Sequence, residues 1–144
     1  MLIKRSLGQN FVIYLSQNLV NVLFTDTVVN GNCYITHRDD SGLVSIKGIT
    51  NQCRARYRIT FGGNIAIPTG GTVDAISLAI AIDGEAVPSS SMIVTPAAVA
   101  NYFNVHSTIF VDVPRGCCST ISVKNITTSA IAVQNANLII ERVA

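Results

Sequence analysis

The stretch Ala75-Ile-Ser-Leu-Ala-Ile-Ala-Ile82, followed by Asp83-Gly84, decides the fold class of this chain. Large aliphatic residues alternate in it with small ones, and alternate side chains of a strand point to opposite faces of a sheet. Asp83-Gly84 can supply the positive φ angles that a two-residue hairpin turn requires. The pattern predicts an antiparallel strand that is dry on both faces, one packed on the core and the other on a second subunit. The second, small face carries Ala75, Ser77, Ala79 and Ala81.

The composition supports a self-associating chain. Hydrophobic residues make up 49% of the 144 residues and charged residues only 12%, whereas an ordinary soluble domain carries about 25% charged residues. A monomer needs charged surface to stay apart from its neighbours, so we expect partners to cover much of this surface. The alternative is a hydrophobic but monomeric β protein. The length suits a single domain with a substantial core.

Short β-branched segments separated by turn residues run along the whole chain, and no long amphipathic helix is evident. Gly62-Gly63 is expected to interrupt one strand, and residues 96–100 could form a single helical turn. About ten strands in one domain predict an all-β antiparallel sandwich of the Greek-key type rather than an up-and-down barrel. Residues 1–18 are expected to be an N-terminal arm and residues 19–144 the folded domain. The strands are expected over residues 19–29, 33–37, 43–47, 49–61, 64–67, 75–82, 85–87, 92–95, 102–113, 118–125 and 131–143.

Residues 102–113 form a long strand with two distinct faces. One face is predicted to be apolar and the other more polar, since apolar residues recur at alternate positions. The apolar face would carry Phe103, Val105, Ile109, Val111 and Val113, and the other face Tyr102, Asn104, His106, Thr108, Phe110 and Asp112.

The net charge of +2 is too small for a nucleic-acid-binding protein, and no aromatic platform accompanies the basic residues. Arg54, Arg56 and Arg58 alternate, so they share one face of a strand. The favoured interpretation is a solvated or ion-paired strand face. The alternatives are contact with nucleic acid, with an acidic protein surface or with a carboxylate of a neighbouring subunit. No segment is predicted to be a signal peptide or to cross a membrane, so we expect synthesis in the cytosol.

Residues that carry chemistry are scarce. The sequence has no nucleophile, zinc-protease or phosphate-loop motif, and its two histidines make no metal-ligand spacing with the cysteines. Asp39-Asp40 is expected to be a solvated turn rather than a cation site, and Asn125-Ile-Thr127 a chance match to a glycosylation acceptor. We therefore expect neither an enzyme nor a protein with a cofactor or metal. Cys33, Cys53, Cys117 and Cys118 are predicted to be small buried side chains.

Three stretches resemble the trimeric jelly rolls of the tumour-necrosis-factor and complement-globular-head kind. They are Tyr57-Arg-Ile-Thr-Phe61, Asn64-Ile-Ala-Ile-Pro-Thr-Gly-Gly71 and Ile76-Ser-Leu-Ala-Ile-Ala-Ile-Asp-Gly84. The end of the chain, Val123-Lys-Asn-Ile-Thr-Thr128 and Val133-Gln-Asn-Ala-Asn-Leu-Ile-Ile-Glu-Arg142, is similar too. The resemblance extends to the C-terminal domains of collagen-like spore-surface glycoproteins and to virion proteins of phages of Gram-positive gut bacteria, and covers residues 43–144 best.

This resemblance implies a ten-strand jelly roll that forms a threefold homotrimer. Its interface would include Ala75, Ser77, Ala79, Ala81, Tyr102 and Phe110. Because no collagen-like Gly-X-Y segment is present, the resemblance favours a phage capsid decoration or cement protein over a spore filament protein. Such a trimer would bind the major capsid protein on the outer surface of the virion and stabilise the assembled head. The arm would contact the capsid through Lys4, Arg5, Phe11 and Tyr14.

A second hypothesis is a trimeric binding module in a head fibre or on a cell surface, which recognises a glycan or receptor through its outer loops. Asp39, Asp40, Tyr102 and His106 would be the contacts. The absence of tryptophan weighs against sugar binding. A spore-surface structural protein without a collagen stalk is a third possibility.

Overall fold

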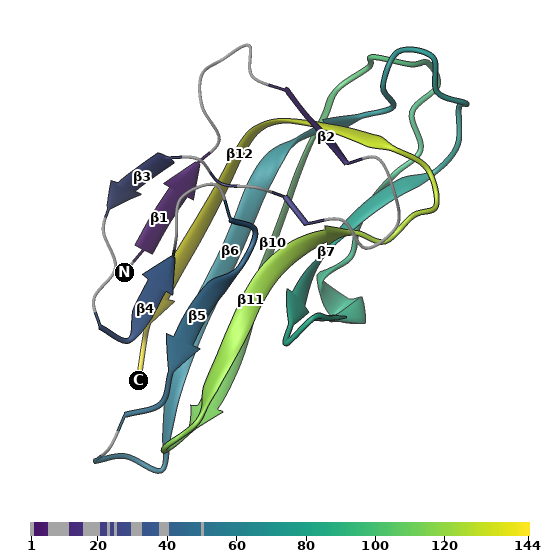
Figure 1. Cartoon of the computed structure of the whole chain (residues 1–144). Helices are drawn as coiled ribbons and strands as arrows, with labels where there is room; N and C mark the ends of the chain where they lie inside the picture. Colours follow the sequence, from purple (N-terminus) through teal and green to yellow (C-terminus); the bar gives the residue numbers. More distant parts are fainter. Residues whose placement is uncertain are drawn as a thin grey trace.

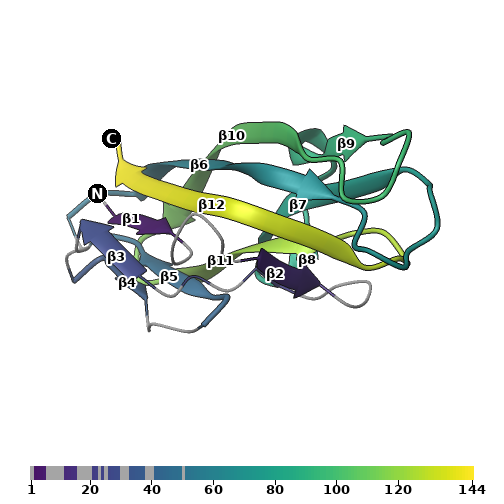
Figure 2. The ribbon, with the colours of Figure 1, turned by 90° about the horizontal axis from the view of Figure 1, so that it is seen from above.

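The computed structural model describes residues 2–5, 12–15, 21–22, 24, 26–29, 33–37, 41–49 and 51–144. Antiparallel strands in these ranges form two six-stranded sheets, and the only helix among them is the short 3-10 helix η1 (Pro88–Ser90). Figure 2 shows the two layers, with β6, β10 and β12 in one and β5 and β11 in the other. The predicted all-β sandwich is therefore confirmed.

Sheet A has the strand order β10-β6-β12-β1-β3, with β2 paired to β12 (Figure 1). Sheet B has the order β4-β5-β11-β7-β8, with β9 paired to β7. The strands of sheet A are β1 (Leu2–Arg5), β2 (Val12–Leu15), β3 (Asp26–Val29), β6 (Arg54–Ala66), β10 (Phe103–Pro114) and β12 (Ile131–Arg142). Those of sheet B are β4 (Ile35–His37), β5 (Val44–Lys47), β7 (Ile76–Ile82), β8 (Glu85–Ala86), β9 (Met92–Val94) and β11 (Cys118–Asn125).

The core lies between the two sheets and is built by strict alternation. On β6, Tyr57, Ile59 and Phe61 are fully buried, while the residues between them are partly or fully exposed. Ile76, Leu78 and Ile80 on β7 close the core from sheet B. The bulky face predicted for residues 75–82 therefore packs on the core, as expected.

The predicted Asp83-Gly84 hairpin joins β7 to β8. Both residues have positive φ angles, 52° for Asp83 and 85° for Gly84, which is the backbone shape of a type I′ turn. The Asp83 carboxylate also accepts a hydrogen bond from the backbone N–H of Thr120 at 2.9 Å. Asp83 therefore adopts the backbone shape of the turn and also connects the turn to the neighbouring strand β11 by a hydrogen bond.

The expectation that Gly62-Gly63 interrupts a strand was wrong, because β6 runs unbroken through both glycines. The irregularity lies in the partner strand β12, whose register with β6 shifts between Gln134 and Asn137. A Cβ at Gly63 would stand 3.3 Å from the Cα of Ala136. Glycine is thus needed where the bulge of β12 approaches the β6 backbone.

Two further expectations differ from the structure. The strand predicted from residue 49 begins at Arg54, since residues 51–53 form a turn and bends, and residues 96–100 form bends and a turn instead of a helical turn. The N-terminal arm is also revised in part, because β1 lies inside sheet A between β12 and β3 and Leu2 belongs to the core. The first residues thus contribute a strand to the domain itself.

Candidate functional site

The small-residue face of β7 is already covered within one chain. Ala79 and Ala81 are fully buried and Ser77 is nearly so, although they face away from the core, whereas Ala75 is exposed. Lys124 lies opposite Ala79, and its ammonium group donates to the Gly84 carbonyl at 2.8 Å, so its aliphatic stem runs along this face. A second subunit is therefore not required to keep this face dry, and its role in a trimer interface stays a prediction.

The outer face of sheet A is polar, as predicted for residues 102–113. His106, Thr108, Phe110 and Asp112 on β10 are exposed, while Val105, Val111 and Val113 are buried. Thr108 shares a hydrogen bond of 3.1 Å with Thr60 on β6, and Asn104 donates to Asn64 at 3.2 Å. Phe103 differs from the prediction, because its side chain is partly exposed at the beginning of the strand.

The arginine stripe of β6 is ion-paired within the chain. Arg56 donates to both carboxylate oxygens of Asp112, at 2.8 and 3.0 Å, and Arg54 lies 3.7 Å from the same carboxylate. Arg58 pairs with Glu141 on β12. The hydrogen bond from Arg56 lowers the pKa of Asp112, and the same bond raises the pKa of Arg56. The favoured interpretation of an ion-paired strand face is therefore confirmed.

Large apolar side chains are exposed where β9 and β10 form one long side of the sandwich. β10 is the outermost strand of sheet A, β9 pairs with β7 of sheet B, and the two strands pack against each other. Ile93 is 67% exposed and Phe110 is 61% exposed. We call these two strands and the segment between them the β9–β10 edge, and its exposed apolar residues are Ile93, Val99, Tyr102, Phe103 and Phe110. Ile93 pairs with Ser77 and so lies on the outer face of sheet B, whereas Phe110 pairs with Arg58 and lies on the outer face of sheet A.

Sequence reasoning found only part of this edge. Tyr102 and Phe110 were predicted as interface residues, whereas Ile93, Val99 and Phe103 were missed. The short β9 strand is bounded by serine-rich and proline-containing turns, so its pattern alone does not show which face is exposed. Only the pairing of β9 with β7 and its contact with β10 place the two strands on the same edge of the sandwich.

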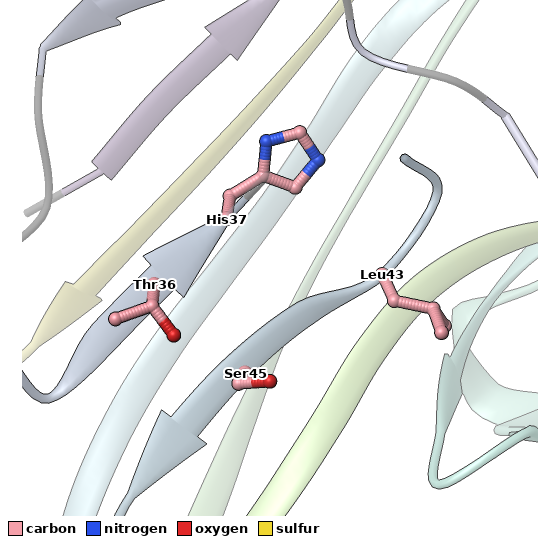
Figure 3. A pocket seen from close by; sticks show the side chains of 4 residues that line it. All are labelled: Thr36, His37, Leu43 and Ser45. Atoms are coloured by element: carbon pink, nitrogen blue, oxygen red, sulfur yellow. The ribbon is translucent and has the colours of Figure 1, made fainter. Parts of the chain in front are cut away.

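A shallow groove on sheet B is a second candidate surface (Figure 3). It has a volume of about 330 Å³ and is lined by Thr36, His37, Leu43 and Ser45. Thr36 and Ser45 are partners in the β4–β5 pair, so their hydroxyl groups lie on the same face. His37 Nε2 lies 2.8 Å from the Ser41 carbonyl, and its ring packs edge-to-face on Phe24. These contacts fix the imidazole at one rim of the groove.

Of the four residues predicted for glycan or receptor binding, the structure describes Tyr102 and His106. Tyr102 and His106 belong to the sheet A side of the molecule, whereas the groove lies on sheet B. Asp39 and Asp40 lie outside the described residues. Of the residues predicted for capsid contact, Lys4 and Arg5 lie on β1, Tyr14 lies on β2, and Phe11 lies outside the described residues.

The prediction of buried cysteines was wrong, because all four thiols are free and exposed. Cysteine is one of the most buried residue types on average, yet Cys33 stands in a turn, Cys53 in a bend and Cys117 directly after the turn at residues 115–116, and Cys118 is the first residue of β11. Turns place side chains at the ends of the sandwich, where the core does not reach. Position in the fold thus overrides the average tendency of the residue.

Asn125 is buried and has a structural role in the turn that follows β11. Its amide donates to the Ser129 carbonyl at 2.8 Å, and its carbonyl accepts the Thr127 N–H at 2.8 Å and the Thr127 hydroxyl at 2.6 Å. These bonds account for the Asn-Ile-Thr triplet without glycosylation, which supports the interpretation of a chance match.

Within the part of the chain that the structure describes, no group of three or more His, Cys, Asp or Glu side chains is placed to hold a metal ion. No helix there is long and apolar enough to cross a membrane. Both findings concern the described residues alone.

No family model matches the chain, and no curated protein matches its sequence. Among solved structures, the globular domain of zebrafish complement 1qA protein is similar with a TM-score of 0.60 and 11% identity, covering 96% of this chain and 94% of that one. Murine APRIL is similar with a TM-score of 0.54 and 11% identity, covering 92% and 98%. The chain therefore has a jelly-roll fold of the tumour-necrosis-factor and C1q kind. At 11% identity the similarity establishes the fold alone, and the function has to be argued from the residues of the site.

Proposed function

We propose that this chain is a non-enzymatic structural domain that forms a homotrimer, and that it serves as a decoration protein on a phage capsid. The observation that carries the proposal is the β9–β10 edge, which presents five large apolar side chains to solvent in a chain with only 12% charged residues. Large apolar side chains exposed in such number along one edge favour a site of association. The jelly-roll fold and the resemblance to trimeric virion proteins support the same conclusion.

The polar face of sheet A fits the rim of such an interface. Arg56 with Asp112 and Arg58 with Glu141 form ion pairs beside Phe110. Apolar centres surrounded by polar rims are the usual anatomy of protein interfaces. In a trimer, these pairs would surround the aromatic ring of Phe110 and orient the subunits.

Decoration would then follow from binding linkage. A ligand that binds only the assembled shell stabilises that shell, and three weak contacts on one trimer add through avidity.

Because β1 is an internal strand of sheet A, deletion of the N-terminal residues would damage the domain itself. The paired substitution Lys4→Glu and Arg5→Glu changes the charge of this segment and keeps the backbone pairing of β1 with β12.

The test has two arms. Sedimentation equilibrium should give a mass of three chains of 15.3 kDa. The trimer should also cosediment with capsids that were assembled without this protein. The Lys4→Glu, Arg5→Glu variant should remain trimeric and lose capsid binding. A monomeric mass at micromolar concentration contradicts the proposed homotrimer. A trimer that binds none of the capsids tested contradicts the proposed decoration role.

The groove on sheet B favours a second candidate, a surface binding module. Its Thr36 and Ser45 hydroxyl groups are suited to hydrogen bonding with a polyhydroxy ligand such as a glycan, and His37, held by Ser41 and Phe24, shapes the rim. The Thr36→Val, Ser45→Ala variant should lose binding on a glycan array, with Leu43 retained as the apolar wall. Equal array signals from parent and variant, or none from either, contradict this candidate.

A further inference from the structure

The four exposed thiols gather at one end of the sandwich. The connection between β5 and β6 and the turn between β10 and β11 meet at this end (Figure 1, bottom). Cys53 precedes β6, and its carbonyl accepts the backbone N–H of Arg115 at 3.1 Å. Cys117 accepts the backbone N–H of Gly48 at 3.0 Å, and Cys118 is paired with Lys47.

Cys33 belongs to the same group. It precedes Tyr34, whose carbonyl accepts the backbone N–H of Lys47 at 2.9 Å. Cys33 and Cys117 therefore flank β5 from its two sides. We call this surface, formed by Cys33, Cys53, Cys117 and Cys118 with the basic residues around them, the thiol end.

Within the structure the four thiols are unpaired, and two of the possible pairs are excluded by strand geometry. Two strands that flank a third are about 9.6 Å apart, and a disulfide needs Cα atoms within about 7 Å, so Cys33 does not reach Cys117. Cys117 and Cys118 are neighbours in sequence and cannot form a relaxed bridge. All four thiols are free, and in the described ranges no cluster of metal ligands occurs.

The surface around these thiols is basic. Lys47 lies opposite Cys118, and Arg115 lies beside Cys53 and two residues before Cys117. Both are exposed, and no carboxylate among the described residues forms a salt bridge with either. Arg54 adds a third cation, with Asp112 as its partner at 3.7 Å. Positive charge at this density attracts anionic reagents and repels cationic ones at low salt.

We propose that the thiol end is a modification site for anionic low-molecular-weight disulfides, of which glutathione disulfide is the representative. A cysteine thiolate attacks one sulfur of the small disulfide and forms a new S–S bond with it. The S–S bond of the reagent breaks, and its other half leaves as a thiolate that takes a proton from solvent. The oxidising equivalent comes entirely from the small disulfide. A second copy of the same end is disfavoured as a partner, because it carries the same positive charge.

The experiment compares two reagents of opposite charge on the folded protein. Glutathione disulfide is anionic and cystamine is cationic, and the rate of mixed-disulfide formation is followed by intact mass and by mapping of the modified cysteine. At low ionic strength we expect glutathione disulfide to react about three to ten times faster than cystamine, after each rate is divided by that of the urea-unfolded chain. At about 0.5 M salt the preference should collapse.

A matched control moves the thiol to an acidic place. Ser89 is exposed in η1 and lies beside the hairpin that carries Asp83 and Glu85. A chain with all four cysteines changed to Ser and with Ser89→Cys should prefer cystamine. Because that chain could fail to fold, Lys47→Gln, Arg115→Gln in the natural background is the second test, and it should lose most of the preference.

Three outcomes overturn the proposal. They are equal normalised rates for the two reagents on the folded parent, an unchanged preference in the Lys47→Gln, Arg115→Gln variant, and chain-to-chain disulfides as the main product on non-reducing gels. None of them bears on whether the chain trimerises or binds a capsid.

Discussion

Truncation of Phe110 should weaken the trimer. The residue is 61% exposed in the single chain, and a fully covered Phe removes about 150–250 Å² from water. Covering the exposed part therefore buries about 120 Å², which is worth about 3 kcal/mol per protomer at 25 cal/mol per Å². Phe110→Ala keeps part of this area, so we expect a loss of about 2 kcal/mol per protomer.

Three protomers lose this amount together, which is about 6 kcal/mol for the whole trimer. The concentration at half dissociation varies as the square root of the trimer dissociation constant, and should therefore rise about a hundredfold. Sedimentation velocity from nanomolar to micromolar concentration measures this shift, with circular dichroism to check that the fold is intact.

The control is Leu43→Ala, which removes an exposed apolar side chain of similar size from the sheet B side of the molecule. It should leave the dissociation midpoint unchanged. If Phe110→Ala and Leu43→Ala have the same midpoint as the parent, Phe110 is not buried between subunits and the placement of the interface on the β9–β10 edge is wrong.

Three further predictions concern stability, each measured by chemical denaturation of the folded chain. Gly48→Ala should cost about 3 kcal/mol or more, because its Cβ would stand 2.2 Å from the Pro114 carbonyl oxygen. Gly70→Ala should cost only about 1 kcal/mol for its positive φ, since no atom of the described residues lies within 4 Å of the added Cβ, and similar costs for the two would contradict the close approach at Gly48. Ser122→Ala should stabilise the chain by about 1 kcal/mol, because its buried hydroxyl has no hydrogen-bond partner among the described residues; a loss of stability would mean that the hydroxyl is bonded in solution. Burial raises the pKa of Tyr57, so its contribution to stability is complete below the unfolded pKa of about 10 and is lost as pH rises through the folded value. Tyr57→Phe should flatten the decline of stability between about pH 9 and 11, and an unchanged slope would assign that decline to other groups.

Local pattern predicted the elements whose structure depends on neighbours in sequence. The alternation of residues 76–82 and the Asp83-Gly84 turn were predicted correctly, because strand pleat and turn backbone are set within a few residues. The two faces of β10 followed from the same alternation. Resemblance supplied the jelly-roll topology, which periodicity alone does not specify.

Long-range pairing explains the expectations that failed. Gly62 and Gly63 look like strand breakers, yet they permit the bulge of β12, which comes some seventy residues later in the chain. The cysteines look like core residues, yet the turns that hold them lie outside the core.

The sequence by itself determined an all-β chain with a hairpin at Asp83-Gly84, two-faced strands and few charged residues, since these follow from local sterics and composition. Only the tertiary structure decided which carboxylates neutralise the arginines of β6, which apolar side chains are exposed along the β9–β10 edge, and that four separate thiols share one end. Each of these depends on contacts between strands far apart in the chain, because sheet pairing and not sequence distance sets which side chains become neighbours.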